Sequence, residues 1–215
     1  MKKGLTEIVF ILDESGSMSG LEKDTVGGFN SFIKKQRKIE GETLVSVVLF
    51  NENSKVLYDR TELSKIETMT ENQYCPGGCT ALLDAVGNAL NHIRTIHKYA
   101  REEDQPEKTV FVITTDGEEN SSREFTYRKV KELIERQQKD YDWEFIFLGA
   151  NIDAGEEAAK IGIAPEQAVR YECDSAGTLL NFEVLGEAMC SVREGKKLNR
   201  SWKKDIEKYY GEKER

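Results

Sequence analysis

An apolar run, Ile8-Val9-Phe10-Ile11-Leu12, leads directly into Asp13-Glu14-Ser15-Gly16-Ser17 near the start of this 215-residue chain. Short runs that are rich in β-branched and aromatic residues are typical of strands buried on both faces of a parallel sheet. The residues that follow supply one carboxylate and two hydroxyl groups at alternate positions. The stretch therefore predicts a buried strand that ends in a loop carrying three oxygen ligands.

Further apolar runs alternate with helical patterns along the chain. We expect additional buried strands at residues 44–50, 109–114, 143–148 and 168–171. Between the runs, apolar residues recur every three or four positions, which predicts helices within 26–33, 82–96, 127–134, 154–161 and 178–192. This alternation predicts an α/β fold, namely a Rossmann-like, doubly wound, mostly parallel central sheet with helices on both faces.

One segment departs from the parallel pattern. Residues 54–58 have the composition of a strand, and only Asn51-Glu52-Asn53 separate them from the strand predicted before them. A connection this short permits only an antiparallel pair, because parallel strands need a crossover of a dozen or more residues. We therefore expect one antiparallel edge strand.

The composition changes near Gly195. Beyond it, Leu198, Trp202, Ile206 and Tyr209 fall on one helical face, and lysines occupy the other. The sequence thus predicts a domain at residues 1–195 and a basic amphipathic C-terminal helix or tail at 196–215. Two interpretations remain open: a terminal helix packed on the domain, or a detached helix that binds a partner.

The charge is distributed unevenly. The chain carries a formal charge of −8, but its last twenty residues hold eight Lys or Arg against four Asp or Glu, so the remaining 195 residues carry −12. Nucleic acids are bound chiefly through clustered Lys and Arg, and an acidic body repels the phosphate backbone. We therefore expect no nucleic-acid partner.

Neither targeting nor disulfide signals are evident. The first apolar run has five residues and ends at Asp13, which is too short for the core of a signal peptide, and no run approaches a membrane span. The four cysteines match neither paired zinc-ligand spacing nor a disulfide scaffold; they are Cys75, Cys79, Cys173 and Cys190. We expect reduced thiols, a cytoplasmic location and no membrane partner.

Two further segments bring polar side chains to the ends of predicted elements. Gly77-Gly78-Cys79-Thr80-Ala81-Leu82 opens a predicted helix, and the apolar strand Val110 to Thr114 leads into Thr115-Asp116-Gly117. Ligands of open parallel sheets bind beyond the carboxyl ends of the strands. Asp13 and Asp116 can therefore meet at one edge, within reach of the loop that carries Thr80.

Together the three segments resemble the von Willebrand factor A family, over roughly residues 5–193. In that family the corresponding residues form a metal-ion-dependent adhesion site, or MIDAS. The resemblance implies a metal site at Asp13, Ser15, Ser17, Thr80 and Asp116. It also implies a stand-alone protein of bacterial type that binds another protein, with an Asp or Glu of the partner completing the metal shell. Relatives of this kind act as adaptors in multi-protein systems such as ATPase or stress-response complexes.

The ligand set itself favours Mg²⁺, or alternatively Mn²⁺. Hydroxyl and carboxylate oxygens suit hard divalent cations, whereas calcium sites gather more carboxylate and carbonyl oxygens. Two carboxylates neutralise a +2 ion and three hydroxyls add no charge. The bound cation therefore keeps enough Lewis acidity to attract an anionic oxygen from outside.

The sequence gives little support to catalysis. A Ser nucleophile would need a base, yet His92 and His97 lie toward the far end of the helix that begins near Thr80. The two histidines are five residues apart and so do not form an i, i+4 metal pair, and no nucleotide-binding glycine motif occurs. We therefore predict no enzyme, with no catalytic and no cofactor-binding residues.

Two alternatives to the metal-dependent function remain open. The chain could be a scaffold that binds partners through its C-terminal tail, with a non-essential metal site. A Mg²⁺-dependent hydrolase is the less favoured alternative, since it would require a base near the cation.

Cys75 and Cys79 are expected to be free thiols rather than a redox or metal-binding pair. Residues 118–120 are expected to be an acidic cap on a helix starting near Ser122.

Overall fold

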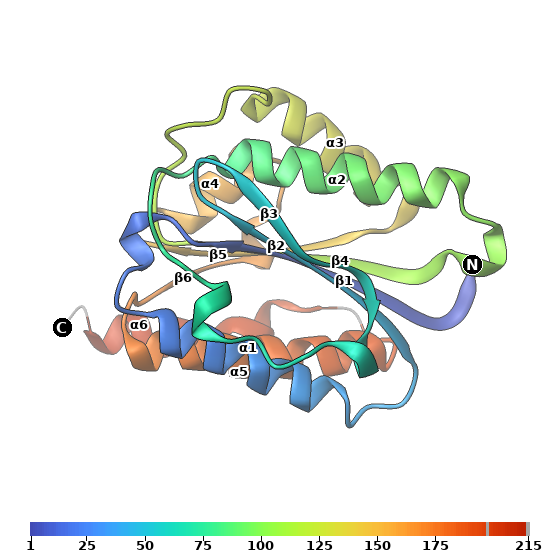
Figure 1. Ribbon diagram of the computed structural model, residues 1–215, viewed down its shortest axis with the longest axis horizontal. Helices are drawn as coiled ribbons and strands as arrows, with labels where there is room; N and C mark the ends of the chain where they lie inside the picture. The colour runs from blue at the N-terminus through green and yellow to red at the C-terminus, as the bar shows by residue number, and fades with distance from the viewer. Residues whose placement is uncertain (197, 214–215) are drawn as a thin grey trace.

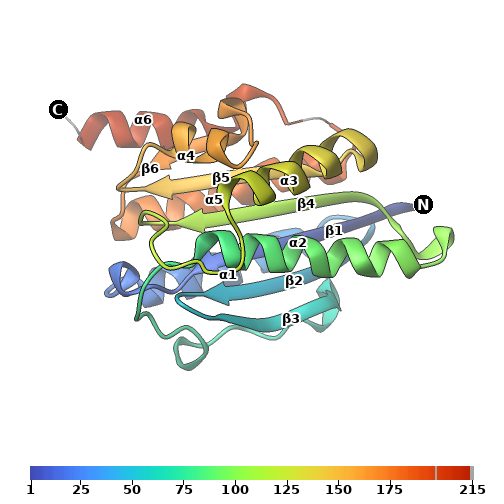
Figure 2. The ribbon, with the colours of Figure 1, turned by 90° about the horizontal axis from the view of Figure 1, so that it is seen from above.

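The computed structural model describes residues 1–196 and 198–213. A six-stranded sheet runs through its centre in the order β3-β2-β1-β4-β5-β6. All neighbouring strands are parallel except β2 and β3. The strands are β1 (Lys2–Asp13), β2 (Glu42–Phe50), β3 (Ser54–Glu62), β4 (Pro106–Thr115), β5 (Glu144–Ala150) and β6 (Ala168–Tyr171). The predicted α/β fold is confirmed (Figures 1 and 2).

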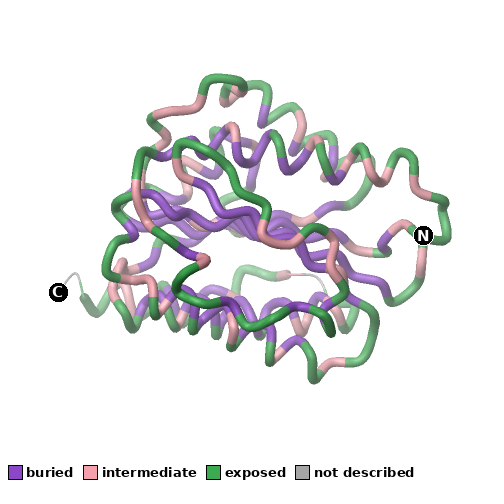
Figure 3. Tube along the Cα trace, in the orientation of Figure 1, coloured by how far each residue is buried: buried purple, intermediate pink, exposed green. Residues whose placement is uncertain are grey.

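Helices cover both faces of the sheet (Figure 1). On one face lie α2 (Leu82–Tyr99), α3 (Tyr127–Tyr141) and the short α4 (Ala154–Lys160). On the other lie α1 (Glu22–Gln36), α5 (Ser175–Arg193) and α6 (Lys204–Lys213). Figure 3 shows the result: the sheet is buried between the two layers, and the outer sides of the helices are exposed.

The opening apolar run explains this three-layer arrangement. Successive side chains of a strand point to opposite faces. Phe10 accordingly packs into the core on the α1 and α5 side, and Ile11 packs into the core on the α2 and α3 side. The ring of Phe10 meets those of Phe29 and Phe32 edge to face, with centroids 5.5 and 4.9 Å away. Because both faces are covered, the run from Ile8 to Leu12 is apolar at every position.

The edge strand occurs as predicted. Phe50 of β2 pairs with Ser54 of β3, so the chain reverses within residues 51–53. β3 extends beyond the predicted segment to Glu62, and the register of its pairing with β2 shifts near Val47. Many of its residues are exposed, as expected for the end of a sheet.

The prediction of a helix start near Ser122 is wrong. α3 begins at Tyr127, where the Thr126 hydroxyl caps it by accepting a hydrogen bond from the Lys129 amide at 3.4 Å. The Glu119 carboxylate accepts from the Ser122 amide at 2.7 Å and from the Leu83 amide of α2 at 2.9 Å. This carboxylate therefore holds the loop against α2 instead of capping α3, so the chain becomes helical only beyond the loop.

The C-terminal segment packs against the domain. Ile206 of α6 is 2% exposed, and its side chain joins the core on the α1 and α5 side. The Tyr209 hydroxyl donates to the Asp174 carboxylate at 3.0 Å, and Lys213 forms an ion pair with the same carboxylate at 3.0 Å. Residues 197, 214 and 215 of the predicted tail lie outside the described residues. Within the part that is described, the amphipathic face packs against the domain and is not detached.

None of the helices in the described part of the chain is both long and apolar enough to cross a membrane.

Candidate metal centre

The pairing of β1 with β4 brings the two predicted carboxylate ligands together. Leu12 lies beside Thr114 in the parallel ladder, so both strands end at the same edge of the sheet. Asp13 and Asp116 follow at that edge, although 103 positions separate them in sequence. The Thr115 hydroxyl, beside Asp116 in the chain, donates to Asp13 Oδ2 at 2.6 Å and links the two strand ends.

Two hydroxyl groups connect the carboxylates into one cluster. Ser17 Oγ donates to Asp116 Oδ1 at 2.6 Å and lies 3.1 Å from Ser15 Oγ. The Ser15 amide donates to Asp13 Oδ1 at 2.7 Å, which turns the chain sharply after β1. A short 3-10 helix over Gly16–Met18 then presents both hydroxyls toward the same point.

Thr80 reaches this cluster from the loop before α2. A Cβ placed on Gly117 would lie 3.7 Å from both Ser17 Oγ and Thr80 Oγ1, so the two hydroxyls face the same small space. Asn120 holds Thr80 there through two hydrogen bonds. The Asn120 side-chain oxygen accepts from the Thr80 backbone amide at 2.9 Å, and the Asn120 backbone amide donates to the Thr80 carbonyl at 3.0 Å. The structure thus brings together all five residues that the sequence indicated.

Of the two glycines before Thr80, Gly78 has a structural reason to be glycine. Gly78 has φ of +78°, and a Cβ there would lie 2.7 Å from a Glu52 carboxylate oxygen. A side chain would be both strained and obstructed at this position. The backbone also docks onto the first loop, because the Gly77 amide donates to the Glu14 carbonyl at 2.9 Å and the Gly16 amide to the Gly78 carbonyl at 3.1 Å. The Thr80 loop and the Ser15 loop are therefore held to each other.

Electrostatics make the cluster receptive to a cation. Asp13 and Asp116 are each 1% exposed. Burial raises the pKa of both carboxyls, and the negative charge of Asp13 raises the pKa of Asp116 further. Among the described residues, neither carboxylate forms an ion pair with Lys or Arg. Two buried carboxylates without a positive partner are destabilising, and a divalent cation would offset that cost.

The donor set fits a hard divalent cation. Two carboxylates and three hydroxyls are the oxygen ligands that Mg²⁺ accepts alongside water. The described residues contain no cluster of three or more His, Cys, Asp or Glu that could hold a metal by themselves. Any metal centre at this edge therefore depends on the hydroxyl groups of Ser15, Ser17 and Thr80.

Three supporting residues could not be recognised from the sequence. The Tyr74 hydroxyl donates to the Asp13 carbonyl at 2.5 Å, and burial raises the pKa of Tyr74, so the phenol stays protonated. Asn151 donates to the Asp116 carbonyl at 3.2 Å. Cys173 Sγ lies 3.8 Å from Asp116 Oδ2, and burial followed by the Asp116 charge raises the pKa of its thiol to about 11. These residues come from distant loops, and no local motif marks them.

The cysteines are therefore expected to differ in reactivity. Cys75 and Cys79 are free and exposed, whereas Cys173 is half-buried. Since the thiolate is the reactive form, brief treatment with iodoacetamide at pH 7.5 is expected to label Cys75 and Cys79 well before Cys173. Peptide mass spectrometry over time checks the order, with fully denatured protein as the control. Labelling of Cys173 at the same rate as Cys79 would contradict this account.

The two histidines have other partners. His92 pairs with Asp59 at 2.9 Å on the surface. His97 pairs with the buried carboxylate of Glu7 at 2.5 Å and packs edge to face on Trp143, at a centroid distance of 5.2 Å. Both imidazoles are engaged in structural contacts away from the five-residue cluster.

Comparisons with known proteins agree with this fold. The profile of the von Willebrand factor type A domain matches residues 7–183. Proximal thread matrix protein 1 from the mussel byssus, in a structure described as having a zinc-occupied MIDAS motif, superposes with a TM-score of 0.60 at 18% identity, covering 87% of this chain and 46% of that one. No curated protein matches the chain significantly.

Two further structures are similar as well. A von Willebrand factor type A protein from Catenulispora acidiphila has a TM-score of 0.55 at 15% identity, covering 86% of this chain and 42% of that one. The ArnB paralog VWA2 from Sulfolobus acidocaldarius has a TM-score of 0.54 at 19% identity, covering 87% and 45%. The chain spans less than half the length of each of these proteins. At these identities the likeness establishes the fold.

Proposed function

Because this chain belongs to the von Willebrand factor type A domain family, we propose that it is a metal-dependent protein-binding module and not an enzyme. The observation that carries the proposal is the convergence of two buried carboxylates and three hydroxyls at one edge of the sheet, with no positive side chain paired to the carboxylates among the described residues. That arrangement suits a cation, which would engage both carboxylates, and both histidines pair elsewhere, with Asp59 and Glu7. The zinc-occupied motif of the mussel protein supports a divalent cation in this fold.

We assign Asp13, Ser15, Ser17, Thr80 and Asp116 as the residues that would hold the cation, with Mg²⁺ favoured and Mn²⁺ able to replace it. The bound cation would supply a Lewis-acid position for an anionic oxygen. The chain's own residues orient that position: Asn120 fixes Thr80, and Thr115 fixes the Asp13 carboxylate.

The surface around the centre is accessible to a partner. Gly16, Ser17, Gly78 and Cys79 are all exposed, and their side chains are small. A protruding loop of another protein can therefore place an Asp or Glu carboxylate at the cation without displacing a large side chain. All four cysteines are free, which is consistent with a cytoplasmic adaptor inside a multi-protein assembly, the setting that we propose.

Binding through the C-terminal tail is the weaker alternative. Its apolar face is already engaged, because Ile206 is buried in the core and Trp202 donates to the Glu166 carbonyl at 3.1 Å. A tail that packs in this way has little apolar surface left for a partner.

An affinity pull-down from the source organism's extract tests the proposal. We expect the wild-type chain to retain a partner in Mg²⁺ and to release it in EDTA, and we expect Thr80→Ala to retain none. Thr95→Ala is the matched control, because Thr95 lies exposed on α2 and bonds only within that helix, to the Asn91 carbonyl. A partner held equally by the wild type in EDTA and by Thr80→Ala would refute metal-dependent binding.

A further inference from the structure

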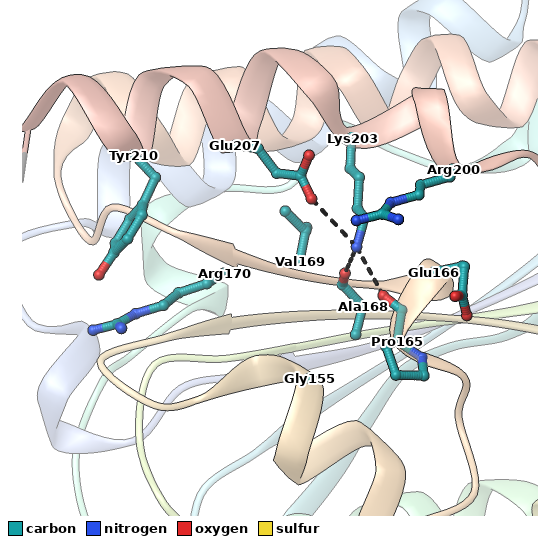
Figure 4. A pocket seen from close by; sticks show the side chains of 10 residues that line it. All are labelled: Gly155, Pro165, Glu166, Ala168, Val169, Arg170, Arg200, Lys203, Glu207 and Tyr210. Carbon is teal, nitrogen blue, oxygen red and sulfur yellow. Dashed lines mark hydrogen bonds and ion pairs between the residues drawn. The ribbon is translucent and has the colours of Figure 1, made fainter.

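A groove runs along the outer side of β6, separate from the five-residue cluster (Figure 4). β6 is the last strand of the sheet, so no strand pairs with it on that side. α6 borders the groove on one side and the start of α4 on the other, and the volume between them is about 320 Å³. The charged residues of the lining are Glu166, Arg170, Arg200, Lys203 and Glu207.

The C-terminal segment forms one wall of this groove through Lys203. Its ammonium group donates to the Pro165 carbonyl at 2.7 Å and to the Ala168 carbonyl at 2.5 Å, and it pairs with Glu207 at 3.4 Å. These three contacts use all three ammonium protons. Lys203 and Glu207 therefore interact within the protein, and the other charged side chains of the lining are the ones that a ligand could contact.

Two arginines in the groove lack a carboxylate partner within the described part of the chain. The Arg170 guanidinium lies 4.7 Å from the centre of the Tyr210 ring, which leaves its N–H groups available at the edges. Arg200 forms no ion pair with any described residue. Glu166 supplies the one remaining acidic group of the lining. The lining thus carries three positive side chains, Arg170, Arg200 and Lys203, against two negative ones, Glu166 and Glu207, within a chain of net charge −8.

The two guanidinium groups do not converge. In Figure 4, Arg170 lies beside Tyr210 at one end of the groove, and Arg200 comes from the other end, with its guanidinium drawn near Lys203. A single small anion could not contact both. A ligand with separated negative charges, lying along the strand edge, could contact both at once.

We propose that this groove binds an extended acidic peptide segment of a partner protein, with one carboxylate at Arg170 and another at Arg200. Carboxylates form bidentate hydrogen bonds with guanidinium groups, which makes arginine the suitable residue at both ends. The exposed ring of Pro165 also lines the groove and offers an apolar contact to the side chains between the acidic positions. This binding needs no cation and so goes beyond the proposed function.

The test uses the full-length, ¹⁵N-labelled protein in EDTA, so that no carboxylate can bind through a metal. The probe is acetyl-Glu-Val-Glu-Val-Glu-amide, and acetyl-Gln-Val-Gln-Val-Gln-amide is the uncharged control. We expect the acidic peptide to shift the amide resonances of Arg170, Arg200 and their neighbours, and the uncharged peptide to shift none. Loss of either charge-assisted contact, in Arg170→Gln or Arg200→Gln, is expected to weaken binding about tenfold.

Arg128→Gln is the matched control, because Arg128 is an exposed arginine on α3 with a side chain that is 83% exposed. It should bind the acidic peptide as the wild type does. The inference is overturned if the peptide shifts no groove resonance at millimolar concentration, if it shifts residues of the Asp13 to Ser17 loop instead, or if the two groove variants bind like the wild type. None of these results would bear on the metal-dependent pull-down, which fails or succeeds independently.

Discussion

Asparagine in place of Asp13 is expected to remove cation binding while leaving the fold intact. The substitution keeps the shape of the side chain and an acceptor for the Ser15 amide, but it removes one of the two charges that would hold the metal. Removing a residue that only hydrogen-bonds to a metal ligand typically lowers metal affinity about 10- to 100-fold. Removing the charge of a ligand itself should therefore lower the affinity for the cation by about 100-fold or more. Titration calorimetry with MgCl₂ and MnCl₂ measures this change.

Asp13→Asn should change the stability of the fold in opposite directions without and with the cation. Burial raises the pKa of Asp13, so the ionised carboxylate is disfavoured in the folded chain, and at neutral pH this group costs stability in the absence of metal. Metal-free Asp13→Asn should therefore unfold at a temperature equal to or above that of the metal-free wild type. A cation at 100 times its dissociation constant stabilises the wild type by about 2.7 kcal/mol, and this gain should vanish in the variant.

Asp140→Asn is the control, because Asp140 lies on α3 in a surface pair with Arg136 at 3.6 Å. It should keep the full cation response. If Asp13→Asn retains the same Mg²⁺-dependent rise in unfolding temperature, Asp13 does not ligate the cation.

Alanine in place of Glu7 is expected to be the most destabilising single change away from the metal centre. Glu7 is fully buried, with its two carboxylate oxygens 2.5 Å from Arg60 Nε and 2.5 Å from His97 Nε2. Removing the carboxylate leaves two partly buried groups without their partner, which costs about 3–5 kcal/mol. Urea unfolding at neutral pH measures the loss.

Glu62→Ala is the matched control, because Glu62 pairs with Lys65 at the surface, at 2.9 Å, with 58% of its side chain exposed. Its effect should stay within about 0.5 kcal/mol. Glu7 lies six residues before Asp13 on β1, about 20 Å away along the strand, so Glu7→Ala should bind Mg²⁺ with wild-type affinity wherever it remains folded. Equal losses of unfolding free energy in Glu7→Ala and Glu62→Ala would show that the contacts of Glu7 with Arg60 and His97 stabilise the fold no more than a surface ion pair does.

The alternation of buried strands and helices was predictable because it follows from local sequence patterns. The run from Ile8 to Leu12 is apolar at every position, and such a strand must have both faces covered, as Phe10 and Ile11 show by packing into separate cores. The meeting of Asp13 with Asp116 followed from one topological rule about the carboxyl ends of parallel strands. Assignment of the metal to these residues stays a prediction.

What the sequence could not indicate depends on contacts between distant segments. Asn120 fixes Thr80 from 40 positions away, and Cys173 touches Asp116 across 57 positions. Neither residue belongs to a local pattern that would mark it. The late start of α3 has the same origin. The Glu119 carboxylate accepts hydrogen bonds from the Leu83 amide of α2 and from the Ser122 amide, so the acidic stretch does not cap a helix near Ser122.

The most direct test of the metal centre is a crystal structure of the chain grown with MnCl₂, with data collected at the manganese absorption edge. The account predicts a strong anomalous peak among the side-chain oxygens of Asp13, Ser15, Ser17, Thr80 and Asp116. An absence of anomalous signal at that edge of the sheet, at manganese concentrations that saturate binding in solution, would contradict it.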